Sequence, residues 1–139
     1  MTMGTLKIVV AEPGKPAEVR TVEDSLDSYQ ALVGGGYIEI LPGAFLGDFD
    51  VVINDSGLLE ELPPNRLIAM HVSLIEARAY AVVGPLFVTK ANGDGDWQSL
   101  TEDEAREVVH ALNAEEGYCR TLRADEVPEP TFTVTDWEP

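Results

Sequence analysis

The 139-residue chain has few basic residues and a single cysteine, and both shortages narrow its possible functions. Nine lysines and arginines stand against 25 aspartates and glutamates, which gives a formal net charge of −16 at pH 7. Such a charge repels nucleic-acid phosphates and anionic lipid headgroups, so we expect no direct nucleic-acid binding and no membrane binding. The single cysteine, Cys119, leaves no intramolecular disulfide, which fits a reducing compartment.

Long apolar runs and a leader sequence are also missing. The longest apolar stretch, residues 79–88, is interrupted by Gly84 and Pro85 and is far shorter than the ~20 residues of a membrane-spanning helix. No basic segment followed by an apolar run opens the chain, so we expect no signal peptide. These absences predict a soluble, cytoplasmic protein.

The hydropathy pattern predicts an α+β domain, with a mainly antiparallel sheet of about five strands and two helices packed on one face. Strands are expected at residues 6–10, 18–22, 37–41, 50–54 and 80–89, the last with a kink or bulge at its Gly-Pro pair. Helices are expected at residues 25–33 and 100–114, and Thr101 and Glu104 form a capping box at the start of the second. Residues 65–78 fit no single period.

We expect one α+β domain over residues 1–122, followed at 123–139 by an acidic, proline-rich tail or edge strand. Charge is concentrated toward this end of the chain, because residues 91–139 hold 3 basic and 13 acidic residues, hence −10 of the −16. Carboxylates in a row can imitate phosphates for a basic partner, although they are also typical of a merely solvated face. The candidate partner-binding residues are Glu102, Asp103, Glu107, Phe132 and Trp137.

Two consecutive prolines, Pro63 and Pro64, form a rigid segment just before Asn65 and Arg66, whose side chains are an amide and a guanidinium. Arginine grips carboxylates and phosphates with two parallel hydrogen bonds, which suggests an anion site; the alternative is a structural arginine paired inside the fold. The candidate ligand-binding residues are Asn65, Arg66, His71 and Arg78.

Catalytic and metal-binding signatures are weak. His71 lies near Glu76 in sequence and could act as a general base, but no nucleophile is positioned beside it. The spacing of Asn92, Asp94 and Asp96 resembles a calcium loop, yet it lacks the required glycine and the final glutamate, which favours an ordinary turn. We therefore expect no enzymatic activity, no metal and no cofactor.

Several sequence segments occur in one order that resembles a known family. They are Glu12-Pro13-Gly14-Lys15, Leu32-Val33-Gly34-Gly35, Val52-Ile53-Asn54, Gly57-Leu58, Leu62-Pro63-Pro64-Asn65-Arg66, Val83-Gly84-Pro85-Leu86-Phe87-Val88 and Ser99-Leu100-Thr101. Over roughly residues 6–113 the chain resembles the domain of unknown function family 3846, a small family encoded by phages and plasmids. The resemblance implies an accessory protein of a mobile element, working in a bacterial cytoplasm, and it implies no enzymatic activity.

These observations support two hypotheses. In the first, the protein is a non-enzymatic binder of a host or defence protein, docking through its acidic surface as a mimic of DNA charge. In the second, it is a small-molecule or nucleotide-binding protein that sequesters its ligand near Arg66. The sequence alone predicts neither the partner nor the oligomeric state.

Overall fold

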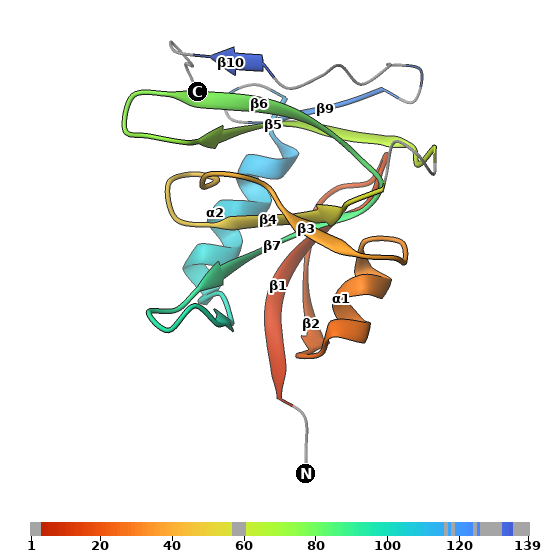
Figure 1. Ribbon diagram of the computed structural model, residues 1–139, viewed down its shortest axis with the longest axis vertical. Helices are drawn as coiled ribbons and strands as arrows, with labels where there is room; N and C mark the ends of the chain where they lie inside the picture. Colours follow the sequence, from red (N-terminus) through yellow and green to blue (C-terminus); the bar gives the residue numbers. More distant parts are fainter. Residues whose placement is uncertain are drawn as a thin grey trace.

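The computed structural model contains two antiparallel sheets and two helices, and it is described for residues 4–56, 61–115, 117, 119–123, 125 and 132–134 (Figure 1). The strands are β1 (Thr5–Ala11), β2 (Glu18–Glu23), β3 (Ile38–Ile40), β4 (Asp50–Asn54), β5 (Pro64–His71), β6 (Ala77–Val83), β7 (Leu86–Ala91), β8 (Trp97–Gln98), β9 (Cys119–Thr121) and β10 (Phe132–Val134). The helices are α1 (Leu26–Leu32) and α2 (Glu102–Asn113). None of the helices among these residues is long and apolar enough to cross a membrane.

The first sheet has the strand order β2-β1-β7-β4-β3, and the short β8 pairs with β7. Its hairpin β1–β2 runs in register from Thr5 opposite Glu23 to Val10 opposite Glu18. The second sheet has the order β10-β6-β5-β9 and lies across one end of the molecule (Figure 1). Every pairing between strands of the described residues is antiparallel, so the predicted α+β class with a mainly antiparallel sheet is confirmed.

The second sheet contains the segment whose periodicity was ambiguous. Residues 65–78 form β5, a hairpin turn and the start of β6. Both faces of β5 are largely buried: Ile68, Ala69 and Met70, three residues in a row, are all inaccessible to solvent. A strand buried on both sides has no alternation of polar and apolar residues, which explains why the period could not be read.

Gly84 separates the two sheets. The sequence predicts one kinked strand over 80–89, and this is wrong: β6 ends at Val83 in the second sheet, and β7 begins at Leu86 in the first. Gly84 has a φ of 76°, and an added Cβ would lie 2.6 Å from Cδ1 of Leu62, so the corner requires glycine. Hydropathy does not reveal the corner because the strands on both sides of it are buried.

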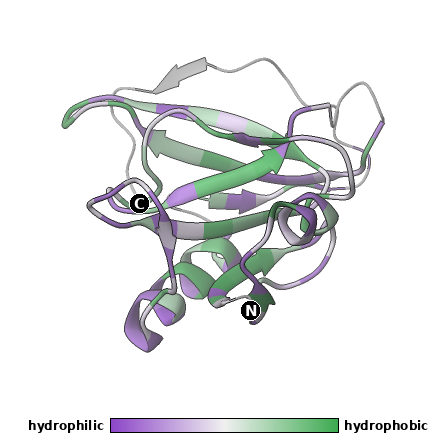
Figure 2. Cartoon of the chain, turned by 60° about the horizontal axis from the view of Figure 1, so that its bottom comes forward, coloured by the Kyte–Doolittle hydropathy of each residue, from purple (hydrophilic) through white to green (hydrophobic). Residues whose placement is uncertain are grey.

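Each face of the first sheet has its own core, and the two helices belong to different cores. Val9 of β1 packs in the core that contains Leu112 of α2 and Ile68 of the second sheet. Its neighbour Val10, which points to the other face, packs in the core that contains Tyr29 of α1. The prediction that both helices cover one face is therefore wrong. Figure 2 shows hydrophobic residues along the central strands of the first sheet.

The helix boundaries follow their capping residues. The Ser25 side chain accepts a hydrogen bond from the Ser28 N–H at the start of α1. At the start of α2, Thr101 and Glu104 form the predicted capping box, with both reciprocal hydrogen bonds present.

Part of the predicted tail forms an edge strand. Residues Phe132–Val134 are β10, which pairs with β6 at the edge of the second sheet. The other described residues of the tail form no strand.

Candidate functional site

Arg66 lies inside the protein at the C-terminal end of α2, with 1% of its surface exposed. Its Nε donates to the Leu112 carbonyl and its Nη2 to the Lys15 carbonyl, both at 2.8 Å, while Nη1 donates to Oδ1 of Asn65 at 2.6 Å. Burial lowers the pKa of Arg66. Among the described residues no carboxylate forms an ion pair with it; the negative end of the α2 dipole offsets its charge.

Asn65 is equally inaccessible and links two other segments. Its Nδ2 donates to the Ala11 carbonyl at 2.9 Å and to the Gly84 carbonyl at 2.8 Å. Together with Arg66 it therefore joins the end of β1, the corner between the sheets, the loop after β1 and the end of α2. All of these contacts are internal, as expected of a structural arginine and its supporting amide.

The four candidate ligand-binding residues do not converge on one cavity. Asn65 and Arg66 contact each other, but His71 lies five residues further along β5, which is about 16 Å of extended strand. Arg78 is exposed on β6, opposite Met70. The anion site predicted for these residues has no counterpart in their arrangement.

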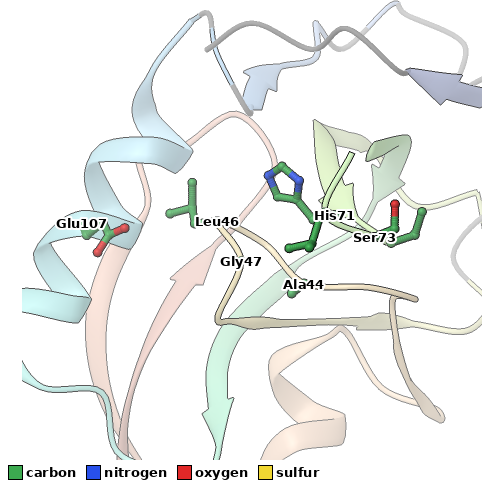
Figure 3. Close-up of a pocket in the computed structure, with 8 residues that line it drawn as sticks. Ala44, Leu46, Gly47, His71, Ser73 and Glu107 are labelled. Atoms are coloured by element: carbon green, nitrogen blue, oxygen red, sulfur yellow. The ribbon is translucent and has the colours of Figure 1, made fainter. Parts of the chain in front are cut away.

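A pocket of about 650 Å³, which we call the hairpin pocket, lies beside the β5–β6 hairpin. It is lined by Ala44, Leu46, Gly47, His71, Val72, Ser73, Leu74 and Glu107. Figure 3 shows these side chains arriving from three parts of the fold: the connection between β3 and β4, the end of β5 with its turn, and α2. The volume is within the range of pockets that take small ligands or side chains of a partner.

The backbone around the pocket is tightly joined. Ala44 and His71 exchange hydrogen bonds, with the Ala44 N–H at 2.9 Å from the His71 carbonyl and the His71 N–H at 2.7 Å from the Ala44 carbonyl. Gly43, at a φ of 92°, makes this approach possible, because an added Cβ would lie 2.5 Å from the His71 carbonyl oxygen. His71 is therefore held at the pocket wall by its own main chain.

Leu46 stands in the left-handed backbone region, with a φ of 57°. A residue with a Cβ is disfavoured there by roughly 1–2 kcal/mol, so the surrounding structure must hold it in place. Its side chain packs partly against the core and partly lines the hairpin pocket. The wall that Leu46 forms is thus fixed before any ligand arrives.

The turn of the β5–β6 hairpin carries two exposed aliphatic side chains. Leu74 is fully exposed, at 103% of its reference area, and Ile75 is 85% exposed. The Ser73 hydroxyl accepts hydrogen bonds from the N–H groups of Ile75 and Glu76 and so holds the turn. Glu76 is not among the described residues that line the pocket with His71, so the pocket adds nothing to the acid–base role that the sequence analysis considered for these two residues and did not favour.

The exposed side of α2 is acidic. The side chains of Glu102 and Asp103 are 85% and 91% exposed, and both pair with Arg106, Asp103 at 2.9 Å and Glu102 at 3.7 Å. Glu107, one turn beyond Asp103 on the same side, is exposed and lines the hairpin pocket. The predicted acidic face exists, and its Glu107 end lies at the pocket.

The remaining sequence candidates lie elsewhere. Asn92 accepts hydrogen bonds from the N–H groups of Asp94 and Asp96, which makes the loop an Asx-type turn. No group of three or more potential metal ligands occurs within the described part of the chain. Phe132 begins β10, and Trp137 lies outside the described residues.

Two features of the pocket were missed from the sequence. Leu74 and Ile75 between the strands were a readable signal, because hairpin turns favour glycine, asparagine and aspartate over aliphatic residues. Leu46 offered no signal, since nothing local in the sequence demands a positive φ for it.

Comparison with known proteins gives a family and no function. No curated protein and no solved structure matches the chain significantly. The sequence model of the domain of unknown function DUF3846 matches residues 6–113, a span that includes both helices and eight of the ten strands. The chain therefore belongs to the DUF3846 family.

Proposed function

We propose that the protein is a non-enzymatic binding protein that docks through the acidic side of α2 onto a basic surface of another protein. The observation that carries the proposal is the line of exposed carboxylates at Glu102, Asp103 and Glu107. Arg106 is the only lysine or arginine within α2, so the side stays net negative. Attraction between such a surface and a basic partner speeds association and selects against acidic partners.

A mimic of DNA charge is a specific form of this proposal. Lysine and arginine side chains that donate hydrogen bonds to phosphates can donate to carboxylates in a similar geometry. A helix presents carboxylates at a fixed spacing of one turn, as at Asp103 and Glu107, about 5–6 Å apart. A protein that binds DNA through a basic groove is therefore the partner class that fits.

The biological setting is part of the proposal and rests on the family resemblance alone. In it, the chain is an accessory protein encoded by a phage or plasmid, acting in the bacterial cytoplasm on a host or defence protein. The competing nucleotide-binding function is not favoured, because its anchors Asn65 and Arg66 are buried and bonded internally.

The test is capture from bacterial lysate with two charge-matched variants. The first carries Glu102→Gln, Asp103→Asn and Glu107→Gln. The control carries Glu39→Gln, Asp55→Asn and Asp94→Asn, which are three exposed acids outside α2, so the net charge changes equally.

We expect the wild type and the control to retain a basic protein at about 50 mM salt and to release it at about 500 mM, since salt screens exposed charges. The α2 variant should retain it at neither concentration. The retained protein is then purified, and its affinity for the three chains is measured. Equal binding of the α2 variant and the control would contradict the proposal.

A further inference from the structure

We infer that the hairpin pocket and the exposed turn beside it form a docking site for a protein segment that places an aliphatic side chain next to a lysine or arginine. The inference deepens the proposed function, on which it rests for the basic character of the partner. It adds the site at which the partner is held and the chemistry that the site selects.

The exposed turn is the first part of the argument. Leu74 and Ile75 have 103% and 85% of their reference areas in solvent, so the fold gains no burial from either. Their side chains take no part in the hydrogen bonds that form the turn. The Val72 and Ser73 N–H groups donate to the Glu76 carbonyl, and the Ser73 hydroxyl accepts from the Ile75 and Glu76 N–H groups. Two adjacent aliphatic side chains projecting into water are typical of an interaction surface.

The second part is the cavity into which this surface continues. Leu74 itself lines the hairpin pocket, together with Leu46 and Val72, so the exposed turn and the pocket share apolar side chains. Leu46 forms one wall, and its packing against the core holds that wall in place before a partner binds. A preformed wall lowers the entropy lost on binding, which favours a partner side chain inserted between Leu46 and Leu74.

The third part is charge. Glu107 lines the pocket, and none of the other described residues that line it is a lysine or an arginine. Asp103 lies one turn away on the same side of α2. An aliphatic anchor in the pocket therefore needs a cationic neighbour in the partner to meet Glu107, and an acidic neighbour would be repelled. The same reasoning disfavours a second copy of this chain, because two copies that each carry a net charge of −16 repel one another.

The probe is a displayed library of random peptides of about ten residues, selected on the full-length chain. We expect the enriched peptides to carry Leu, Ile or Val next to Lys or Arg. The peptide that is enriched most is then synthesised and titrated against the wild type and single variants. Each chosen position is solvent-exposed, so the substitutions leave the core intact.

Leu74→Ser and Glu107→Gln should each weaken binding of this peptide about tenfold, as expected for anchor contacts at a small interface. The matched controls are Tyr37→Ser and Glu39→Gln, an exposed aromatic residue and an exposed acid near β3, and they should change the affinity less than about twofold. Enriched peptides without basic residues, or affinities that Leu74→Ser leaves unchanged, would overturn the inference. So would a concentration-dependent dimer that Leu74→Ser abolishes, because the occupant would then be a second copy.

Failure of this inference and failure of the proposed function give different results. If the triple α2 variant loses the captured lysate protein while Leu74→Ser keeps it, the acidic surface is used and the hairpin pocket is not. If neither variant loses it, both ideas fail.

Discussion

Replacing Arg66 by alanine separates its structural role from a ligand-binding role. Three acceptors lose a short hydrogen bond in this variant: the Leu112 carbonyl, the Lys15 carbonyl and Oδ1 of Asn65, all within 2.8 Å of the guanidinium. The Leu112 carbonyl keeps the longer contact from Sγ of Cys119, at 3.7 Å. Alanine cannot reach any of them, and Arg66 is too deeply placed for bulk water to substitute without opening the fold.

The expected magnitude follows from these contacts. A buried acceptor left without a partner costs about 1–3 kcal/mol. We assign about 1 kcal/mol to the partly buried Lys15 carbonyl and about 1.5 kcal/mol to each of the other two acceptors, which gives a loss of roughly 4 kcal/mol. Domains of this size unfold with about 5–15 kcal/mol, so Arg66→Ala should approach the limit of stability. Arg66→Lys keeps the charge but not the planar fork of donors, and should fall between alanine and the wild type.

The assay is urea unfolding, monitored by circular dichroism and fitted to two states. Arg78→Ala is the matched control, because Arg78 is exposed on the strand beside Arg66, and its substitution should change stability by less than about 0.5 kcal/mol. A loss below about 1 kcal/mol for Arg66→Ala would refute the structural account. Arg66 would then again be a candidate for binding a ligand.

Three further results are expected. Lys90 and the Thr101 N–H hold the pKa of Glu104 below its usual range, so the stability that this carboxylate contributes is present above the unfolded-state pKa of about 4.3 and is lost as the pH falls through the lower folded value. The difference in unfolding free energy between the wild type and Glu104→Gln should therefore shrink in urea titrations repeated from pH 7 down to about pH 3, and a constant difference would count against this cause. Gly84→Ala should lower the melting temperature, since it combines a disfavoured φ of 76° with a 2.6 Å contact to Leu62; an unchanged value would mean that the corner tolerates a side chain. Burial raises the pKa of the Cys119 thiol to about 12, so native protein should resist iodoacetamide at pH 8 and react only after denaturation, as mass spectrometry can show.

The predictable parts of this fold are those with local causes. The α2 capping box at Thr101 and Glu104, and the hairpin between β1 and β2, depend on neighbouring residues and could be read from the sequence. The division into two sheets could not, because Gly84 and Pro85 indicate only a kink within one apolar strand, whereas the structure places a corner between two sheets there. The faces on which α1 and α2 lie depend on long-range packing, which an amphipathic pattern does not encode.

The candidate site shows the same division. Asn65 and Arg66 were correctly singled out as unusual, and the sequence left open whether they hold a ligand or the fold; only their partners 46 to 54 residues away show that their contacts are internal. The acidic side of α2 follows from helical periodicity and was predicted, whereas the meeting of Glu107 with the hairpin pocket requires the tertiary structure.

The segments that carry the family resemblance explain the fold better than the function. Asn54, within one such segment, donates to the Val33 and Gly35 carbonyls and accepts from the Ser56 N–H, just as Asn65 and Arg66 bond to internal carbonyls. A polar side chain that satisfies distant main-chain groups specifies how segments meet, and most of its donors are already used inside the fold. Membership in the family thus predicts that other members share this frame of buried amides and arginine. Under the proposed function, binding specificity should instead differ among members at the exposed positions corresponding to Leu74, Ile75 and the outer side of α2, where nothing in the frame restricts the choice of side chain.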